Sequence, residues 1–161
     1  LPTEAEWELA ARGGLEGAEF VWGSELSPGG VRMANIWEGE FPLVNRSPAG
    51  AGTEPVGSYP PNGYGLHDMA GNVWQWTSDW YEPGHRVDSG CCAAHNPKGG
   101  RRDRSFDPSV PAAIPRKVIK GGSFLCAQNY CRRYRPAARM AQPIDSPICH
   151  LGFRCIVREA A

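Results

Sequence analysis

The sequence predicts an α+β domain with little regular secondary structure. Glycine and proline are frequent, with 20 Gly and 15 Pro among 161 residues, and most apolar stretches are interrupted by one of them. Such breaks shorten helices and strands, and the large indole rings of the six tryptophans can organise a core that short elements do not fill. We expect few and brief strands, and irregular loops held by Trp22, Trp37, Trp74, Trp76 and Trp80.

The only helix that we predict begins near the first residue. Thr3, followed three positions later by Glu6, forms a capping box. The Gly13-Gly14 pair is a typical helix end. The apolar spacing in between predicts a short amphipathic helix. Its predicted apolar positions are Ala5, Trp7, Leu9 and Ala10.

Two strands are predicted in the second half of the chain, after a segment of different character. Residues 82–117 are rich in Pro, Lys and Arg and have hardly any apolar pattern, so we expect a long surface loop or a disordered insert. Residues 117–125 (KVIKGGSFL) predict a strand with a break at Gly121-Gly122, and residues 150–159 (HLGFRCIVRE) predict a final strand. One face of that last strand should carry Leu151, Phe153, Cys155 and Val157.

Composition narrows the function classes. The 17 basic and 17 acidic residues balance, which argues against a nucleic-acid or membrane-surface binder, because such proteins usually carry a basic excess. No apolar run reaches membrane-spanning length. The length suits a single domain, which we expect to be monomeric. The first residue is Leu1 and the helix signal follows at once, so we expect that an N-terminal part is missing.

Cys126 and Cys131 are the main candidates for chemistry. Their spacing differs from that of a CxxC motif, and a tetrahedral zinc ion would need two further ligands. Two thiolates alone suit a soft ion of low coordination number, and Cu(I) fits best. The arginines that follow would favour the thiolate form. They are Arg132, Arg133, Arg135 and Arg139. A disulfide, or two packed cysteines beside a solvated arginine face, remains the alternative.

Several long motifs resemble the formylglycine-generating enzymes, also called sulfatase-modifying factors. They occur in the family's order from Leu1 to about Glu159, with residues 82–117 as the main interruption. The chain is similar to the C-terminal part of the family domain. The motifs are LPTEAEWE, FVWG, ANIWEGEFP, PNGYGLHDMAGNVWQWTSDW, GGSFLCAQNYCRRYRPAAR and LGFRC.

The resemblance implies a fold related to the C-type lectin fold and an oxidase activity. The implied reaction is the oxidation by O2 of a cysteine, in a Cys-x-Pro-x-Arg segment of an unfolded sulfatase, to Cα-formylglycine. Cys126 and Cys131 match the family's paired copper-binding cysteines, and Ser123 matches its active-site serine. The substrate cysteine would be a third ligand of Cu(I).

Three further residues are candidates for substrate binding. Trp76 and Tyr130 are candidates for the wall of the site, where aromatic faces would exclude water, and core packing is their alternative role. Arg132 stands for the arginine-rich segment, which either docks substrate or braces its loop.

The resemblance also implies calcium sites, of which we expect at most one to be kept. Asn35 and the backbone of Ile36 match the first site, but Ala49 stands where the family places an aspartate. At the second site, Asp68 and Gln75 stand where asparagine and glutamate are common, so one carboxylate is kept. A simple turn with packed indoles is the alternative. The second set of matched positions is Asp68, Gly71, Val73 and Gln75.

The other cysteines have weaker assignments. Cys155 matches a cysteine that, in some animal members, pairs with one in the first helix, where this chain has Ala10 and Ala11. We expect Cys155 to be free and buried, as in a bacterial, cytoplasmic member. Cys149 has no expected partner. Adjacent Cys91 and Cys92, with His95 nearby, are an incidental grouping in a loop rather than a metal site.

Two other functions compete with the oxidase. A C-type lectin-like domain also serves as a non-catalytic binding module, because a fold does not guarantee chemistry. The C-terminal lobe of iron-dependent sulfoxide synthases shares this domain, but those enzymes place their iron ligands in another domain and do not need the cysteine pair. RNA binding is disfavoured by the zero net charge.

Overall fold

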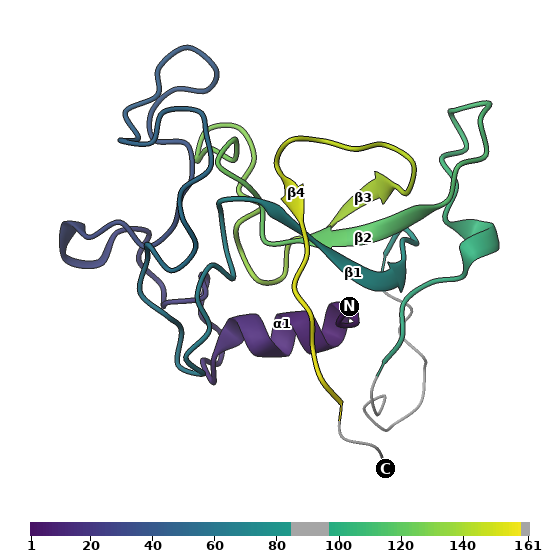
Figure 1. Cartoon of the computed structure of the whole chain (residues 1–161), viewed down its shortest axis with the longest axis horizontal. Helices are drawn as coiled ribbons and strands as arrows, with labels where there is room; N and C mark the ends of the chain where they lie inside the picture. Colours follow the sequence, from purple (N-terminus) through teal and green to yellow (C-terminus); the bar gives the residue numbers. More distant parts are fainter. Residues whose placement is uncertain (85–96, 159–161) are drawn as a thin grey trace.

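The computed structural model describes residues 1–84 and 97–158 and shows a small mixed sheet with one α-helix against it (Figure 1). The helix is α1 (Glu4–Arg12), and the strands are β1 (Trp74–Trp80), β2 (Arg116–Lys120), β3 (Met140–Pro143) and β4 (Leu151–Gly152). Two 3₁₀ turns are η1 (Pro28–Gly30) and η2 (Arg102–Arg104). The strand order is β3-β2-β1-β4, and only the β1–β4 pair is parallel. The predicted α+β class is confirmed.

Both ends of α1 form as the sequence predicts. The Thr3 hydroxyl accepts a hydrogen bond from the Glu6 amide at 3.1 Å, and the Glu6 carboxylate accepts one from the Thr3 amide at 2.7 Å. These two bonds satisfy amides that would otherwise lack a partner in the first turn. At the other end Gly13 adopts φ 58°, in the left-handed region where glycine avoids Cβ strain.

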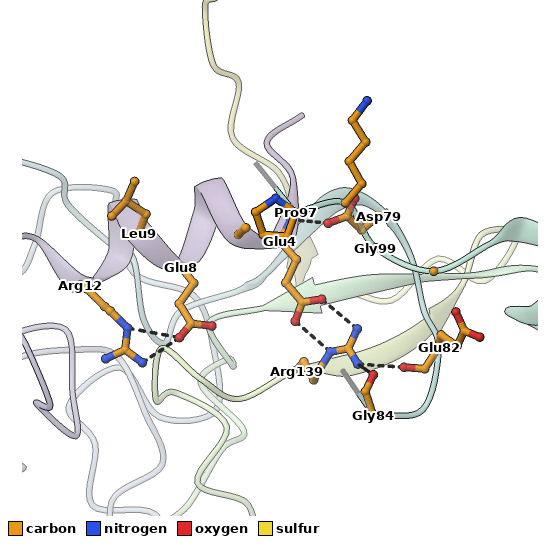
Figure 2. Close-up of a pocket in the computed structure, with 13 residues that line it drawn as sticks. Glu4, Glu8, Leu9, Arg12, Asp79, Glu82, Gly84, Pro97, Gly99 and Arg139 are labelled. Atoms are coloured by element: carbon orange, nitrogen blue, oxygen red, sulfur yellow. Dashed lines mark hydrogen bonds and ion pairs between the residues drawn. The ribbon is translucent and has the colours of Figure 1, made fainter. Parts of the chain in front are cut away.

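The buried face of α1 differs from the predicted one. Trp7 and Ala11 are buried, whereas Leu9 is 66% exposed. Glu4 is buried because its carboxylate forms two 2.8 Å bonds with Arg139, a residue on the chain segment leading to β3 (Figure 2). Fully buried Lys120 on β2 lies 3.6 Å from the same carboxylate. A distant cation therefore rotates the helix relative to its apolar pattern.

The longest strand, β1, was not predicted, because its buried face is polar. Gln75 accepts a hydrogen bond from the Trp7 indole at 2.8 Å, and Thr77 donates one to the Val118 carbonyl at 2.9 Å. The Asp79 carboxylate accepts from the Glu4 amide at 2.7 Å. Each polar side chain thus replaces apolar packing with a specific bond to a neighbouring element. The tryptophans of β1 behave as expected, with Trp74 buried and Trp76 and Trp80 half-buried.

The predicted strand over residues 150–159 is wrong beyond its first residues. β4 pairs with β1 only at Trp74 and Gln75, and residues 153–158 then leave the sheet and run past α1 (Figure 1). Without a partner strand, Phe153 is 68% and Val157 is 96% exposed. Cys155 is also exposed, which corrects the expectation that it is buried.

The segment 82–117 is a loop for most of its described length, but it is not confined to the surface. Ser105 is fully buried, and its backbone oxygen accepts a 2.9 Å bond from the Arg116 side chain. Strand β2 already begins at Arg116, within the predicted loop. Cys91, Cys92 and His95 lie outside the described residues.

The predicted break after β2 is confirmed and directs the chain toward the cysteines. Gly121 and Gly122 adopt φ 89° and 71°. A Cβ atom on Gly122 would lie 2.9 Å from the Tyr134 backbone nitrogen, too close for any other residue. The backbone that follows Cys131 can therefore pass directly over the glycine turn.

Candidate functional site

The two sequence-predicted cysteines meet on one irregular loop. The Cys126 amide donates to the Ser123 carbonyl at 2.9 Å, and the Tyr130 amide donates to the Ala127 carbonyl at 3.2 Å. These tight turns bring the two sulfur atoms to 3.1 Å, with both cysteines free. Cys126 is buried in the core and Cys131 is half-buried. The spacing in sequence thus becomes a pair of adjacent thiols with one open side.

The environment divides the two thiols into one acid and one base. A hydrogen bond from Cys126 lowers the pKa of Cys131 to about 6, and the positive charge of Arg133 and nearby backbone amides lower it further against the effect of burial. The same hydrogen bond, together with burial, raises the pKa of Cys126 well above its ordinary value. At neutral pH Cys131 is therefore a thiolate that accepts a hydrogen bond from the Cys126 thiol.

This asymmetry predicts the pH dependence of alkylation at Cys131. Because iodoacetamide attacks the thiolate, the rate at Cys131 should fall as pH is lowered through about 6 and level off above pH 7. In urea, the same residue should follow the ordinary thiol value of about 8.5. Mass spectrometry of the Cys131 peptide measures both profiles, and coincident profiles would contradict the assignment.

The arginines after Cys131 have separate roles. Arg132 pairs with Glu19 and so braces the loop against residues near the end of α1. Arg139 pairs with Glu4, and Arg135 donates to the Arg132 carbonyl at 3.0 Å. Arg133 is exposed and acts on the two thiols. Of the alternatives for Arg132, the geometry favours bracing.

Aromatic side chains lie beside the open side of the pair. Tyr130 is 68% exposed and stacks on Phe41 with ring centres 4.5 Å apart. Phe41 in turn contacts Trp37 edge-on at 5.0 Å. Sequence reasoning missed Phe41 and Trp37, although both lie in the quoted segment ANIWEGEFP. Trp76 instead lines a hollow with residues 144–148 and Leu151.

Ser123 supports the loop from beneath. Its side chain is buried, and its hydroxyl accepts a 3.3 Å bond from the Leu125 amide. Contact with the Ser123 main chain lowers the pKa of Cys126, opposing the larger effects. The structure therefore places Ser123 against the thiol pair, as the sequence predicted.

Sequence comparison assigns the chain to a family. The model of the sulfatase-modifying factor enzyme 1-like domain matches residues 1–159. The chain belongs to this family. The formylglycine-generating enzyme of Mycobacterium tuberculosis is 49% identical over 160 residues, which are 97% of this chain and 50% of that protein.

Other members of the sulfatase-modifying factor family set limits on the assignment. A Mus musculus protein named inactive C-alpha-formylglycine-generating enzyme 2 is 35% identical over 159 residues, 96% of this chain and 42% of that protein. The solved structure of Treponema denticola variable protein 1 superposes with a TM-score of 0.63 and 29% identity, covering 95% of this chain and 45% of that one. The chain spans about half the length of the curated relatives it matches. Family membership supports the fold and leaves catalysis to be argued from the thiols.

The first calcium set implied by the family fits the ion poorly. Asn35 is buried, and its side-chain oxygen has no hydrogen-bond partner among the described residues, as a cation ligand would require. Its amide nitrogen, however, is bonded to Gly52 and Asn72, and Ala49 offers no carboxylate. Calcium takes six to eight oxygen ligands. One side-chain oxygen beside the Ile36 backbone falls far short of that set.

The second set does not fit calcium, because an arginine takes its oxygen atoms. Arg154 donates to the Gln75 side-chain oxygen at 2.7 Å and to the backbone oxygens of His67 and Asp68 at 2.9 and 3.3 Å. The Asp68 carboxylate turns away and accepts from the Gly57 amide at 2.7 Å. The backbone of Gly71 and Val73 joins the same turn. We infer that the Arg154 guanidinium supplies the positive charge that the family sequence assigns to calcium.

This inference predicts a specific stability result. Arg154→Met should lower the free energy of unfolding by about 1–2 kcal/mol, because it removes the donor from several partly buried oxygens. Adding calcium or EGTA should leave the wild-type midpoint in urea unchanged. The control is Arg158→Met on the same segment, whose exposed pair with Glu6 should contribute little. A calcium-dependent midpoint in the wild-type protein would contradict the inference.

The remaining candidates form no further centre. Cys149 and Cys155 are exposed and free. Within residues 1–84 and 97–158, no group of three or more His, Cys, Asp or Glu side chains is arranged to hold a metal ion. No helix in this part of the chain has the length and apolarity needed to cross a membrane.

Proposed function

We propose that the chain oxidises a cysteine in a Cys-x-Pro-x-Arg segment of an unfolded sulfatase to Cα-formylglycine, with O2 as oxidant and Cu(I) held by Cys126 and Cys131. The observation that carries the proposal is the pair of free sulfur atoms 3.1 Å apart, one buried and one reachable from solvent. Relatives named formylglycine-generating enzymes support the sulfatase as partner.

The donor set fits a soft ion of low coordination number. Two cysteines on a short loop offer two thiolates and no hard ligand, which selects for Cu(I). When bound, Cu(I) would supply a soft centre that accepts the substrate thiolate and conducts electrons from it to O2. Because two protein donors leave coordination open, the substrate cysteine has a place beside Cys131.

The protein's own groups prepare the site for this ligand. Cys131 is already ionised at neutral pH, whereas Cys126 keeps its proton until a metal displaces it. Ser123 and the glycine turn hold the buried thiol in place, and the Arg132–Glu19 pair holds the loop on the other side. The exposed ring of Tyr130 gives a bound polypeptide an apolar surface next to the reacting sulfur.

We further propose that the protein works as a monomer in a bacterial cytoplasm. The four described cysteines are all free, which suits a reducing compartment. Size-exclusion chromatography with light scattering tests the monomer directly.

The decisive test is turnover of a short Cys-x-Pro-x-Arg peptide by the copper-loaded protein in air. We expect a product mass that matches conversion of the thiol to the aldehyde. The conversion should vanish under argon and in the Cys126→Ser variant. Folded, copper-binding protein that leaves the peptide unchanged would refute the oxidase and favour a binding module.

A further inference from the structure

A cavity of about 430 Å³ opens beside the loop that joins the two cysteines. We call it the Trp22–Trp37 pocket. Its volume lies in the range of pockets that enclose small ligands or large side chains. One wall comes from Gln128 and Asn129, the residues between the cysteines. The apolar wall consists of Trp22, Leu26, Met33, Ala34, Ile36 and Trp37.

The two indole rings present only apolar faces to this pocket. The Trp22 indole N–H donates to the Glu25 carbonyl at 2.8 Å, and the Trp37 indole N–H donates to the Val44 carbonyl at 2.9 Å. Both donors are therefore used within the protein. A ligand gains contact area from these rings and no hydrogen bond, which favours an apolar group.

The charged residues of the pocket are already neutralised. Arg32 forms an ion pair with Glu38, donates to the Ser47 hydroxyl at 2.9 Å, and lies 3.7 Å from Glu54. Its guanidinium also lies over the Tyr59 ring at 5.5 Å. Because these partners satisfy the cation, it offers no free charge to an anionic ligand. The pocket therefore selects against charged side chains.

The pocket is continuous with the thiol loop. The Trp37 amide donates to the Cys126 carbonyl at 3.1 Å, so the pocket wall and the metal-binding turn share a backbone bond. Asn129 accepts a 3.3 Å bond from the Phe41 amide, which fixes the rim. Gln128 is exposed, and its amide can bond the backbone of an extended peptide.

We propose that the Trp22–Trp37 pocket binds one large apolar side chain of the polypeptide whose cysteine is presented to Cys126 and Cys131. The proposal rests on the proposed function and adds a requirement to it. The preferred substrate carries a leucine-sized or aromatic residue near the reacting cysteine, outside the Cys, Pro and Arg positions. The pocket would then act as a specificity determinant through substrate binding.

The test uses a set of peptides that share the Cys-x-Pro-x-Arg core and have alanine at every other position. Each alanine is changed in turn to leucine, and kcat and KM are measured with the copper-loaded protein. At one position leucine should lower KM about 10-fold, as expected for burial of its side chain. kcat should stay constant, because the pocket holds ground state and transition state equally.

A matched pair of variants ties the effect to the pocket. Ser27→Trp places an indole at the rim, where Ser27 is exposed and its side chain makes no capping bond. This variant should lose the leucine preference and keep the KM of the all-alanine peptide. The control is Ser24→Trp, at an exposed position that does not line the pocket, and it should keep the preference.

Binding separates the pocket from the oxidase. Labelled peptides with Cys→Ser are titrated into metal-free protein and followed by fluorescence anisotropy. Turnover with equal KM for alanine and leucine at every position would overturn the pocket and leave the oxidase standing. Absence of turnover, with leucine-selective binding that Ser27→Trp removes, would overturn the oxidase and support the pocket. Binding without leucine preference would overturn the pocket in either case.

Discussion

Cys131→Ser should reduce peptide oxidation by more than about 100-fold while the protein stays folded. Even residues that only support metal ligands cost 10–100-fold when changed, so the loss of a ligand should cost more. A serine hydroxyl does not ionise near neutral pH and is a hard donor, so it replaces neither the thiolate nor its softness. Turnover of the Cys-x-Pro-x-Arg peptide, read by mass, gives the magnitude.

The fold should tolerate this change, because Cys131 is half-buried and serine is of similar size. Urea unfolding should show a midpoint close to that of the wild type. Cys155→Ser, at an exposed free cysteine, is the control and should retain full turnover. Retained activity in Cys131→Ser would remove this thiol from the mechanism, whatever the effect on stability.

Glu4→Gln should be among the most destabilising conservative changes in the chain, at about 3 kcal/mol. Glu4 faces Arg139 at 2.8 Å and Lys120 at 3.6 Å, with side-chain exposures of 10%, 15% and 0% for the three residues. Removing the carboxylate charge leaves two buried cations close together. Burial already lowers the pKa of Lys120, and losing Glu4 removes one of the charges that oppose this effect.

Urea denaturation of the wild type and the variant measures the difference. Asp103→Asn is the control, because its pair with Arg101 is more than half exposed at both residues and should contribute nothing measurable. Comparable effects of the two changes would show that the Glu4 cluster is screened by solvent like a surface pair.

Local signals predicted the parts of the fold that depend on neighbouring residues. The capping box at Thr3 and Glu6 depends on a spacing of three, and the glycine break after β2 depends on two adjacent residues. Both are visible in any short window of sequence. The meeting of Cys126 and Cys131 belongs to the same class, since one loop carries both.

Features set by distant partners were not accessible in this way. Leu9 was predicted to be buried, but Arg139 draws Glu4 inward instead. Strand β1 was missed because its interior residues are polar and find partners on α1 and β2. The tail was predicted as a strand because its residues alternate, yet a strand needs a partner beyond Gly152. Each error concerns which side of a segment is covered, and another segment decides that.

The glycine turn has a consequence for the interpretation of mutational scans. Any side chain at Gly122 would collide with the Tyr134 backbone, and one at Gly121 would meet the Met69 carbonyl at 3.1 Å. A saturation library selected for activity should therefore lose variants at these glycines about as completely as at the cysteines. Depletion alone would make four neighbouring positions look equally chemical. A parallel selection for abundance would separate them, since glycine variants should disappear from both selections and cysteine variants only from the first.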